Sequence, residues 1–249
     1  EKGNLSINSE NFLPIIKKWL YTDKDIFIRE LVSNACDAVT KLQKLNMMGE
    51  ADIPTDEKYE IHVVLDQDNK TLQIIDNGIG MTADEIKKYI NQIAFSGATD
   101  FLAKFQEKGE GENEIIGHFG LGFYSAFMVA SSVTVISKKY GEDTAWKWVS
   151  DGADGYTIEE CEKTTPGTDI IMTLKADTED DNFSRFLQEW EIRNLIKKYS
   201  DYIRYPIQME TSRSFNAGTD EEPKYETVQA METLNSMVPL WQKAKKDVT

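Results

Sequence analysis

The sequence contains little cysteine and no long apolar run. Only two cysteines, Cys36 and Cys161, occur among 249 residues. A fold of this size therefore does not depend on a disulfide framework, and a reducing compartment is expected. No apolar stretch reaches the length that crosses a bilayer, and residues 1–4 show no signal-peptide pattern. These absences predict a cytoplasmic location.

Positive charge is also scarce. Lys and Arg number 28 against 43 Asp and Glu, which gives a net charge of -15. A chain this acidic has no general attraction for nucleic-acid backbones or anionic membranes, so neither is expected as a partner. The two histidines, His62 and His118, are too few and too far apart for a zinc site. The 40% of hydrophobic residues is enough for a substantial core.

Apolar periodicity and turn residues define the expected secondary structure. Spacing of 3.6 predicts helices, and alternation predicts strands, with a hairpin turn at residues 66–70. The expected helices cover residues 9–20, 25–45, 83–95, 99–105, 119–129 and 183–203. The expected strands cover residues 5–8, 59–65, 72–74, 133–136, 145–149, 156–161 and 169–174, the last four as an antiparallel meander. This pattern predicts an α+β fold, a two-layer sandwich with helices packed on one face of a mixed, mostly antiparallel sheet.

The composition changes after Met209. Residues 1–210 carry the regular periodicity of one domain, whereas 211–224 are mostly polar with Gly218 and Pro223. We therefore predict a linker or exposed loop over about 211–230. The stretch from 234 to 241 is apolar again and the sequence stops soon after it. This ending predicts that residues 231–249 are the cut start of a second domain.

One helix carries a polar stripe beside its apolar face. Glu30, Asn34, Asp37 and Lys41 fall at i, i+4, i+7 and i+11. A row of carboxylate, amide, carboxylate and ammonium can hold a metal-phosphate group, and Mg²⁺ prefers oxygen ligands. Asn34 can supply one such ligand, and Glu30 could deprotonate a water. Taken alone, the stripe also fits a solvated helix edge.

A second pattern is centred on Asp76. It has the same parity as Leu72 and Ile74, so it faces the core side of its strand. An unpaired buried carboxylate is costly and requires donors, such as the exocyclic amine of adenine. Gly78 and Gly80 let the backbone approach a flat ring closely. Taken alone, Asp-x-Gly-x-Gly also fits an ordinary turn after a strand.

A third pattern is a glycine-rich helix start over residues 117–125. Exposed N–H groups at such a start, with glycines that permit close approach, form an anion cradle. The pattern is not a Walker A motif, because no Gly-Lys-Ser/Thr follows, and no glycine loop after a first strand marks a dinucleotide site. The candidate residues of this segment are Gly117, Phe119, Gly120, Leu121, Gly122 and Phe123. Taken alone, it also fits a plain glycine-rich turn.

Together with residues 167–170, the three patterns resemble one superfamily of ATPases. It includes DNA gyrase B subunits, mismatch-repair MutL proteins, sensor histidine kinases and the ninety-kilodalton heat-shock chaperones, which share the Bergerat (GHKL) fold. Residues 27–38, 76–82, 96–97 and 120–125 are similar to the chaperones' own segments. The resemblance covers residues 4 to about 210, and the short linker is typical of bacterial members.

The resemblance implies ATP or ADP and Mg²⁺ as ligands. Glu30 would be the general base, held by Arg29, and Asn34 would bind the metal. Asp76 would anchor adenine, aided through water by Thr168 and Gly80, and residues 91–117 would form an ATP lid. The full set of implied nucleotide contacts is Asn34, Asp37, Asp76, Ile79, Gly80, Met81, Gly117, Phe119, Gly120, Leu121, Gly122, Phe123 and Thr168.

Two positions depart from many members of that family. Tyr89 replaces an asparagine that touches the ribose side, and Phe95 replaces a lysine that approaches the phosphates. Neither of these two contacts is carried over to this chain.

The resemblance further implies an ATP-driven chaperone that assists folding of unfolded client proteins. The full-length family member is a homodimer, but its dimer contacts and catalytic arginine come from later regions. This stretch is therefore expected to be a monomer with weak hydrolysis. The alternative is a topoisomerase or mismatch-repair ATPase, against which the charge of -15 weighs. A histidine kinase and a module that binds ATP without turnover are further alternatives.

Overall fold

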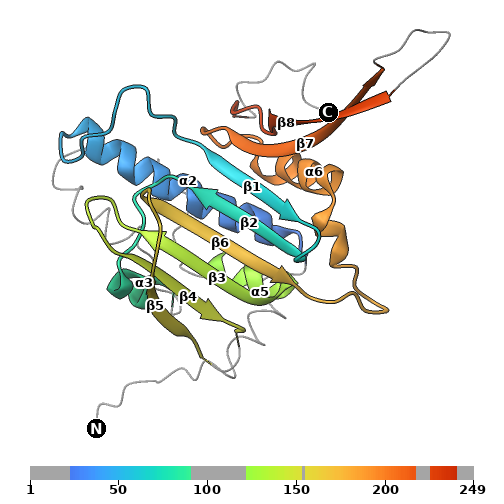
Figure 1. Ribbon diagram of the computed structural model, residues 1–249, viewed down its shortest axis with the longest axis horizontal. Coiled ribbons are helices and arrows are strands. Elements are labelled where there is room, and N and C mark those ends of the chain that lie inside the picture. Colours follow the sequence, from blue (N-terminus) through green and yellow to red (C-terminus); the bar gives the residue numbers. More distant parts are fainter. Residues whose placement is uncertain (1–22, 91–121, 153–154, 217–224, 240–249) are drawn as a thin grey trace.

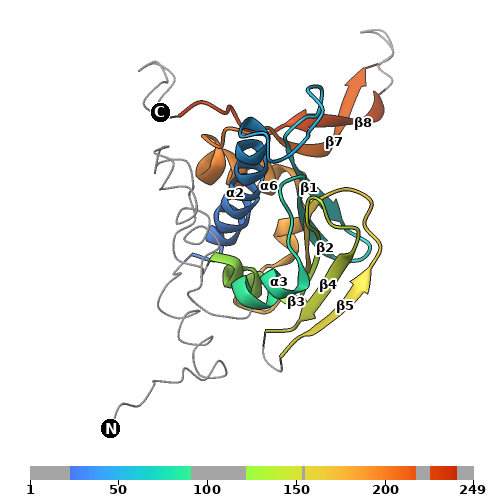
Figure 2. The ribbon, with the colours of Figure 1, turned by 90° about the vertical axis from the view of Figure 1, so that its left-hand side faces the viewer.

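The protein forms a sheet covered by helices on one face, in a computed structural model that describes residues 23–90, 122–152, 155–216 and 225–239 (Figure 1). Turned by 90°, the same molecule shows α2 and α6 on one side of the sheet, so the two layers are distinct (Figure 2). The α+β two-layer prediction is confirmed. The elements predicted at 5–20 and 99–105, and the lid predicted at 91–117, lie outside the described residues.

The sheet has eight strands in the order β5-β4-β3-β6-β2-β1-β7-β8. Neighbouring strands pair antiparallel except β1 and β7, which are parallel, so the sheet is mixed as predicted. The strand bounds are β1 Ile61–Asp66, β2 Thr71–Asp76, β3 Ala130–Lys138, β4 Ala145–Ser150, β5 Thr157–Cys161, β6 Gly167–Leu174, β7 Ile207–Asn216 and β8 Tyr225–Thr233.

Four α-helices and two 3-10 helices occur in the described part of the chain. Their bounds are α2 Ile26–Met47, α3 Ala83–Tyr89, α5 Ala126–Val129, α6 Glu189–Ser200, η2 Gly122–Ser125 and η3 Ser184–Leu187. The described part of the helix predicted at 119–129 is therefore a 3-10 turn that continues into one α-turn. Helix α3 begins with a capping box, in which Thr82 and Glu85 bond each other's backbone N–H.

Helix α2 packs along the sheet because one of its faces is apolar throughout. It begins after Asp25 and ends before Gly49, whose φ of 73° is a conformation that glycine adopts without strain. The helix thus matches the predicted 25–45 closely. The fully buried apolar side chains of this face include Phe27, Ile28, Leu31, Val32 and Val39.

The strand registers arrange the helix-facing side chains in rows across the sheet. One row is apolar over seven strands: Met209, Val63, Ile74, Ile170, Val135, Trp148 and Ile158. The adjoining row on the same face runs Ile207, Ile61, Asp76, Thr168, Ser137, Trp146 and Glu160. Its three central members are polar and buried. Because buried polar groups are costly unless they are bonded, this interruption marks a candidate site.

The predicted antiparallel meander from β3 to β6 is wrong in its last step. Strand β6 pairs with β3 and β2, and β5 remains at the sheet edge. The physical reason is composition. In β6, alternate residues are buried, whereas β5 carries exposed Glu159 and Glu160. An apolar strand gains from a central place, and a charged strand is tolerated at an edge.

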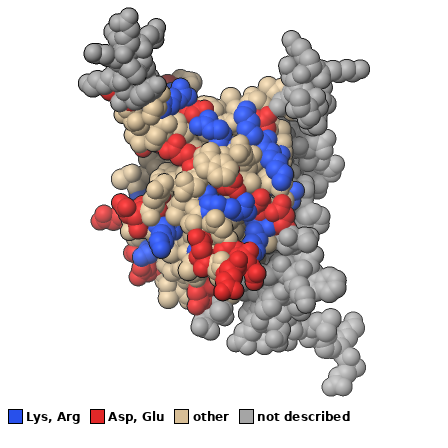
Figure 3. Space-filling view, turned by 90° about the vertical axis from the view of Figure 1, so that its right-hand side faces the viewer, with Lys and Arg blue, Asp and Glu red and all other residues tan. Residues whose placement is uncertain are grey.

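The single long helix predicted over 183–203 is also wrong, because it is divided into η3 and α6. Gln188 between them has extended backbone, with φ −94° and ψ 126°. The periodicity spans the break since both pieces bury apolar residues against the same core. Arg185 in η3 bonds Asp25 and Glu191. Figure 3 shows charges of both signs interspersed over one side of the molecule.

The linker or loop predicted after residue 210 is wrong in its secondary structure. Residues 211–216 continue β7, and residues 225–233 form β8, which pairs antiparallel with it. Strand β7 also joins β1, so the sheet extends beyond the predicted domain boundary. Polar residues are compatible with strands here because this hairpin lies at the edge of the sheet, as Figure 1 shows.

The aromatic pair of Phe27 and Phe186 should contribute strongly to stability. Their rings meet edge to face with centroids 5.1 Å apart, and Phe186 is 1% exposed. We expect Phe186→Ala to lower the free energy of unfolding by about 3–5 kcal/mol in urea titrations, because it leaves a cavity. The matched control is Trp190→Ala, since Trp190 is 59% exposed. It should change stability by less than about 0.5 kcal/mol. Similar losses for both variants would contradict this assignment of the core.

Candidate functional site

The buried carboxylate of Asp76 is the centre of the candidate site. Asp76 lies at the end of β2 and is 5% exposed. Its Oδ1 accepts a hydrogen bond from the Gly78 N–H at 2.9 Å. The nearby Lys163 bonds Asp169 at 2.6 Å instead. Burial raises the pKa of Asp76 to about 7, with the charge of Asp169 as a smaller cause. A carboxylate in this condition gains from any further donor brought by a ligand.

The loop after β2 lies between α2 and β3 with no room for side chains at two positions. A Cβ on Gly78 would lie 2.4 Å from the Ala38 backbone carbon, and the Ile79 N–H donates to the Ala38 carbonyl at 3.1 Å. Gly80 has φ 66°, and its Cβ would lie 1.8 Å from the Lys138 carbonyl oxygen. The two glycines thus bring the loop backbone against both neighbours. The sequence pattern predicted close approach to a flat ring instead, and that prediction remains to be tested.

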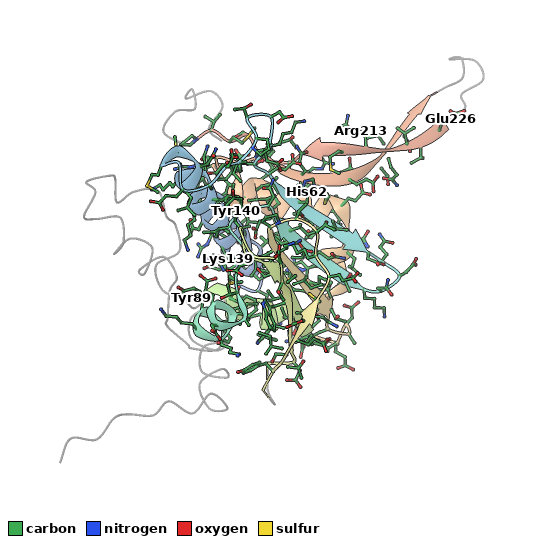
Figure 4. All side chains as sticks on the ribbon, turned by 60° about the vertical axis from the view of Figure 1, so that its left-hand side comes forward. His62, Tyr89, Lys139, Tyr140, Arg213 and Glu226 are labelled. Carbon is green, nitrogen blue, oxygen red and sulfur yellow. The ribbon has the colours of Figure 1, made fainter. Side chains whose placement is uncertain are left out.

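The end of β3 and the residues after it fasten this loop from the other side. The Tyr140 N–H donates to the Ile79 carbonyl at 2.8 Å, and Lys139 pairs with Glu85 of α3. The Tyr140 hydroxyl accepts from the Asp52 N–H at 2.8 Å. Lys139 and Tyr140 therefore connect the β2–α3 loop to α3 and to the segment after α2 (Figure 4). These contacts within the protein hold the loop in place.

Two hydroxyl groups continue the polar row beside Asp76. Thr168 is opposite Asp76 across the β2–β6 pair, and its Oγ1 lies 2.9 Å from Ser137 Oγ. Ser137 is completely buried and accepts the Met81 N–H at 2.8 Å. Sequence reasoning identified Thr168 but missed Ser137, because the predicted strand ended at residue 136. The alternation of Val133 and Val135 was the signal that would have included it.

Arg29 and Glu30 lie together at the start of α2. The Arg29 Nε and Nη2 donate to Glu30 Oε1 at 3.0 and 2.5 Å. Glu30 Oε2 faces η2, since a Cβ on Gly122 would lie 2.6 Å from it. One carboxylate oxygen is thus held by a cation, and the other is next to a glycine backbone. This arrangement suits a group that accepts a proton from water.

The polar stripe of α2 connects the two ends of the site. Asn34 is half-buried, and Asp37 is 5% exposed, directly before Ala38 under the β2–α3 loop. Glu30 and Ala38 are about 12 Å apart along the axis at 1.5 Å per residue. The stripe therefore leads from the Glu30 carboxylate to the loop beside Asp76. An extended nucleoside triphosphate has a length comparable to this distance.

Several predicted site residues are not joined to this arrangement. Gly117, Phe119, Gly120 and Leu121 lie outside the described residues. The ring of Phe123 packs edge to face on Trp148 with centroids 5.7 Å apart, so only its backbone remains for a phosphate. The Tyr124 hydroxyl donates to the Ile90 carbonyl. This bond joins the two flanks of the segment between residues 90 and 122.

The remaining predicted side chains fit less direct roles. Ile79 and Met81 are half-buried on either side of Gly80. Cys36 is buried on α2, and burial raises the pKa of its thiol to about 12, which supports packing rather than reactivity.

Among the described residues, no group of three His, Cys, Asp or Glu side chains could hold a metal ion. In the same part of the chain, no helix is both long and apolar enough to span a membrane.

The chain that carries this buried carboxylate, glycine-containing loop and polar helix edge matches one family of ATPases. A family model described as "Histidine kinase-, DNA gyrase B-, and HSP90-like ATPase" matches residues 23–170. The match covers more than half of the chain, and the chain belongs to this family.

The chain is similar to bacterial chaperones along its whole length. It is 47% identical over 248 residues to the chaperone protein HtpG of Bacillus subtilis (strain 168), covering 100% of the chain and 39% of that protein. It is 44% identical over 249 residues to the HtpG of Alkaliphilus oremlandii (strain OhILAs), with the same coverage of both. The HtpG of Clostridium acetobutylicum is 45% identical over 240 residues, 96% of the chain and 38% of that protein. The chain thus spans about two fifths of the length of these relatives.

The raised pKa of Asp76 predicts an unusual pH dependence of stability. The folded pKa of about 7 exceeds the ordinary value of 3.8, so the folded state binds a proton more tightly than the unfolded state. The destabilisation from Asp76 is therefore absent below about pH 4, grows as pH rises, and is complete above pH 7. We expect Asp76→Asn to raise the melting temperature of the nucleotide-free protein more at pH 8 than at pH 5.

Asp66→Asn is the control for that experiment. Hydrogen bonds from Asn69 lower the pKa of the Asp66 carboxyl, which is the opposite direction. Its removal should lower the melting temperature slightly, and equally at pH 5 and pH 8. An Asp76→Asn protein that is destabilised most at pH 8 would show that the carboxylate has a compensating partner in the fold.

Proposed function

We propose that this chain is the ATP-binding and ATP-hydrolysing part of an HtpG-type molecular chaperone. The observation that carries the proposal is the buried carboxylate of Asp76, which forms no ion pair within the described residues, beside a loop held by Gly78 and Gly80. Family membership and the HtpG relatives support the same conclusion. ATP binding would drive lid closure and a conformational cycle that assists the folding of client proteins.

At one end of the site, Asp76 would accept a hydrogen bond from the exocyclic amine of adenine. This bond would replace hydrogen bonds from water, which burial has removed from the carboxylate. Ile79 and Met81 would line the base, and the Gly80 backbone would approach its plane closely. The residues present fit adenine because Asp76 offers an acceptor that no cation among the described residues pairs with.

At the other end, Glu30 would act as general base on the attacking water. Arg29 bonds Oε1, so among the described contacts Oε2 is the oxygen left for the water. Asn34 lies one helical turn further along and offers the amide oxygen for Mg²⁺, which often takes only one or two protein ligands. The metal would neutralise phosphate charge, and backbone N–H groups at 117–123, including that of Phe123, would meet the terminal phosphate.

The remaining roles follow from the resemblance and the relatives. We propose a cytoplasmic protein whose partners are nucleotide and unfolded clients, with no role for nucleic acid or membrane. Residues 91–117 would be the ATP lid, and the residues after β8 would begin a middle domain, with the dimer contacts in later regions of the longer protein. The nucleotide domain would extend past 210 into the β7–β8 hairpin, since β7 pairs with β1. The chain alone would then be monomeric, with slow hydrolysis.

A topoisomerase or mismatch-repair ATPase is not favoured. The relatives of highest similarity reported above are all named chaperone proteins. The net charge of -15 also opposes binding to a DNA backbone.

The adenine role of Asp76 is tested by binding at pH 8. Asp76→Asn should weaken ADP binding more than about tenfold in calorimetry, because a charge-assisted hydrogen bond is typically worth about 1.5–3 kcal/mol. Asp66→Asn serves again as the matched control and should bind like the wild type. Affinity of the Asp76 variant within about threefold of wild type would refute the adenine anchor.

The base role of Glu30 is tested in the longer protein that contains the middle domain. Glu30→Ala should leave ADP affinity within about threefold and lower steady-state ATP hydrolysis by about 10²–10⁴-fold. Glu57→Ala, a change at an exposed carboxylate outside the site, should leave turnover unchanged. Turnover at the wild-type rate in the Glu30 variant would mean that another group activates the water.

A further inference from the structure

We propose that Ser137 is a specificity-determining residue of the nucleotide site, acting through the hydroxyl of Thr168 on the N1 edge of the purine. The inference deepens the proposed function and rests on it. Ser137 is in β3, is completely buried, and lies in the same row as Asp76 and Thr168 across three adjacent strands. No sequence motif of the site contains it.

The hydrogen bonds around Ser137 define how its single proton can be used. Its Oγ accepts the Met81 N–H at 2.8 Å, which occupies one lone pair. Within the described part of the chain, the acceptors in reach are Thr168 Oγ1 at 2.9 Å and the Gly167 carbonyl at 3.3 Å. The shorter distance favours donation to Thr168. A serine hydroxyl has only one proton, so this choice decides the role of the neighbouring hydroxyl.

The two choices give Thr168 opposite roles. If Ser137 donates to Thr168, the Thr168 proton is left for a ligand. If Ser137 donates to Gly167, Thr168 must donate back to Ser137, and only its lone pairs face the ligand. Adenine presents an amine donor at C6 and an acceptor at N1. Asp76 as acceptor and Thr168 as donor match that edge, directly or through one water. Hypoxanthine, with a carbonyl at C6 and N1–H, matches neither.

Ser137 also fastens the loop that lines the base, so a test must separate specificity from positioning. The probe pair is ADP and 1-deaza-ADP, in which a C–H replaces N1. We expect Ser137→Ala to weaken ADP binding about three- to tenfold in calorimetry, because without the Ser137 donor the Thr168 proton is no longer directed at N1. The same variant should change the affinity for 1-deaza-ADP by less than about twofold, because that ligand has no N1 acceptor to lose.

Two further variants secure the interpretation. Ser137→Cys keeps the site filled with a weak donor and should show the same ADP-selective loss, even if the alanine variant folds poorly. Thr168→Val should weaken the binding of ADP but not that of 1-deaza-ADP. Adding Ser137→Ala to Thr168→Val should have no further effect on ADP binding.

Ser150→Ala is the matched control. Ser150 in β4 is another buried serine of the sheet that accepts a backbone N–H, that of Gly152 at 3.0 Å. It lies outside the candidate site, and its variant should bind both ligands like the wild type.

Equal losses for ADP and 1-deaza-ADP in the Ser137 variants would overturn the proposal and leave Ser137 a purely structural residue. Additive losses in the Thr168→Val background would overturn it as well. Failure of the wild-type protein to bind ADP would instead refute the proposed function, so the two failures are distinguishable.

Discussion

The structure depends on how it accommodates one carboxylate, that of Asp76, inside the layer between helices and sheet. Ionised groups are rarely buried without a cation, and here the neighbouring lysine is bound to Asp169. The surrounding structure supplies backbone N–H groups instead. This solution is incomplete, because burial still raises the pKa of Asp76, and a ligand that brings a donor would offset the residual cost.

Around that carboxylate, neighbouring backbone segments pack so closely that they leave no space for additional side chains. The β2–α3 loop touches α2 at Ala38 and β3 at Lys138, where even a methyl group would not fit. Loops are commonly the mobile parts of a binding site. This loop is fixed by main-chain hydrogen bonds from Ile79 and Tyr140, which resemble sheet pairing more than side-chain contacts. Its shape is therefore set by strand positions and is insensitive to most surface substitutions.

Much of this arrangement could be predicted from local patterns. Helix α2, the β1–β2 hairpin and the inward direction of Asp76 followed from periodicity, because each depends on residues close together in the sequence. Strand order could not be predicted. The place of β6 between β3 and β2 depends on which strand gains most from burial on the whole sheet. The break at Gln188 and the β7–β8 hairpin were missed for a similar reason, since tertiary packing outweighed local propensity there. Ser137 was missed because its role arises from register across three strands.

The central place of β6 has a consequence for how the protein folds. Asp76 and its hydroxyl neighbours come from β2, β6 and β3, and β6 is the last of these strands in the chain. Until β6 enters, β2 and β3 have no common neighbour, and the candidate site is incomplete. Contacts between segments so distant in the chain form late and slowly in most folding reactions. Binding competence should thus emerge in one step with completion of the sheet, so a nascent chain that ends before Gly167 would expose two open strand edges.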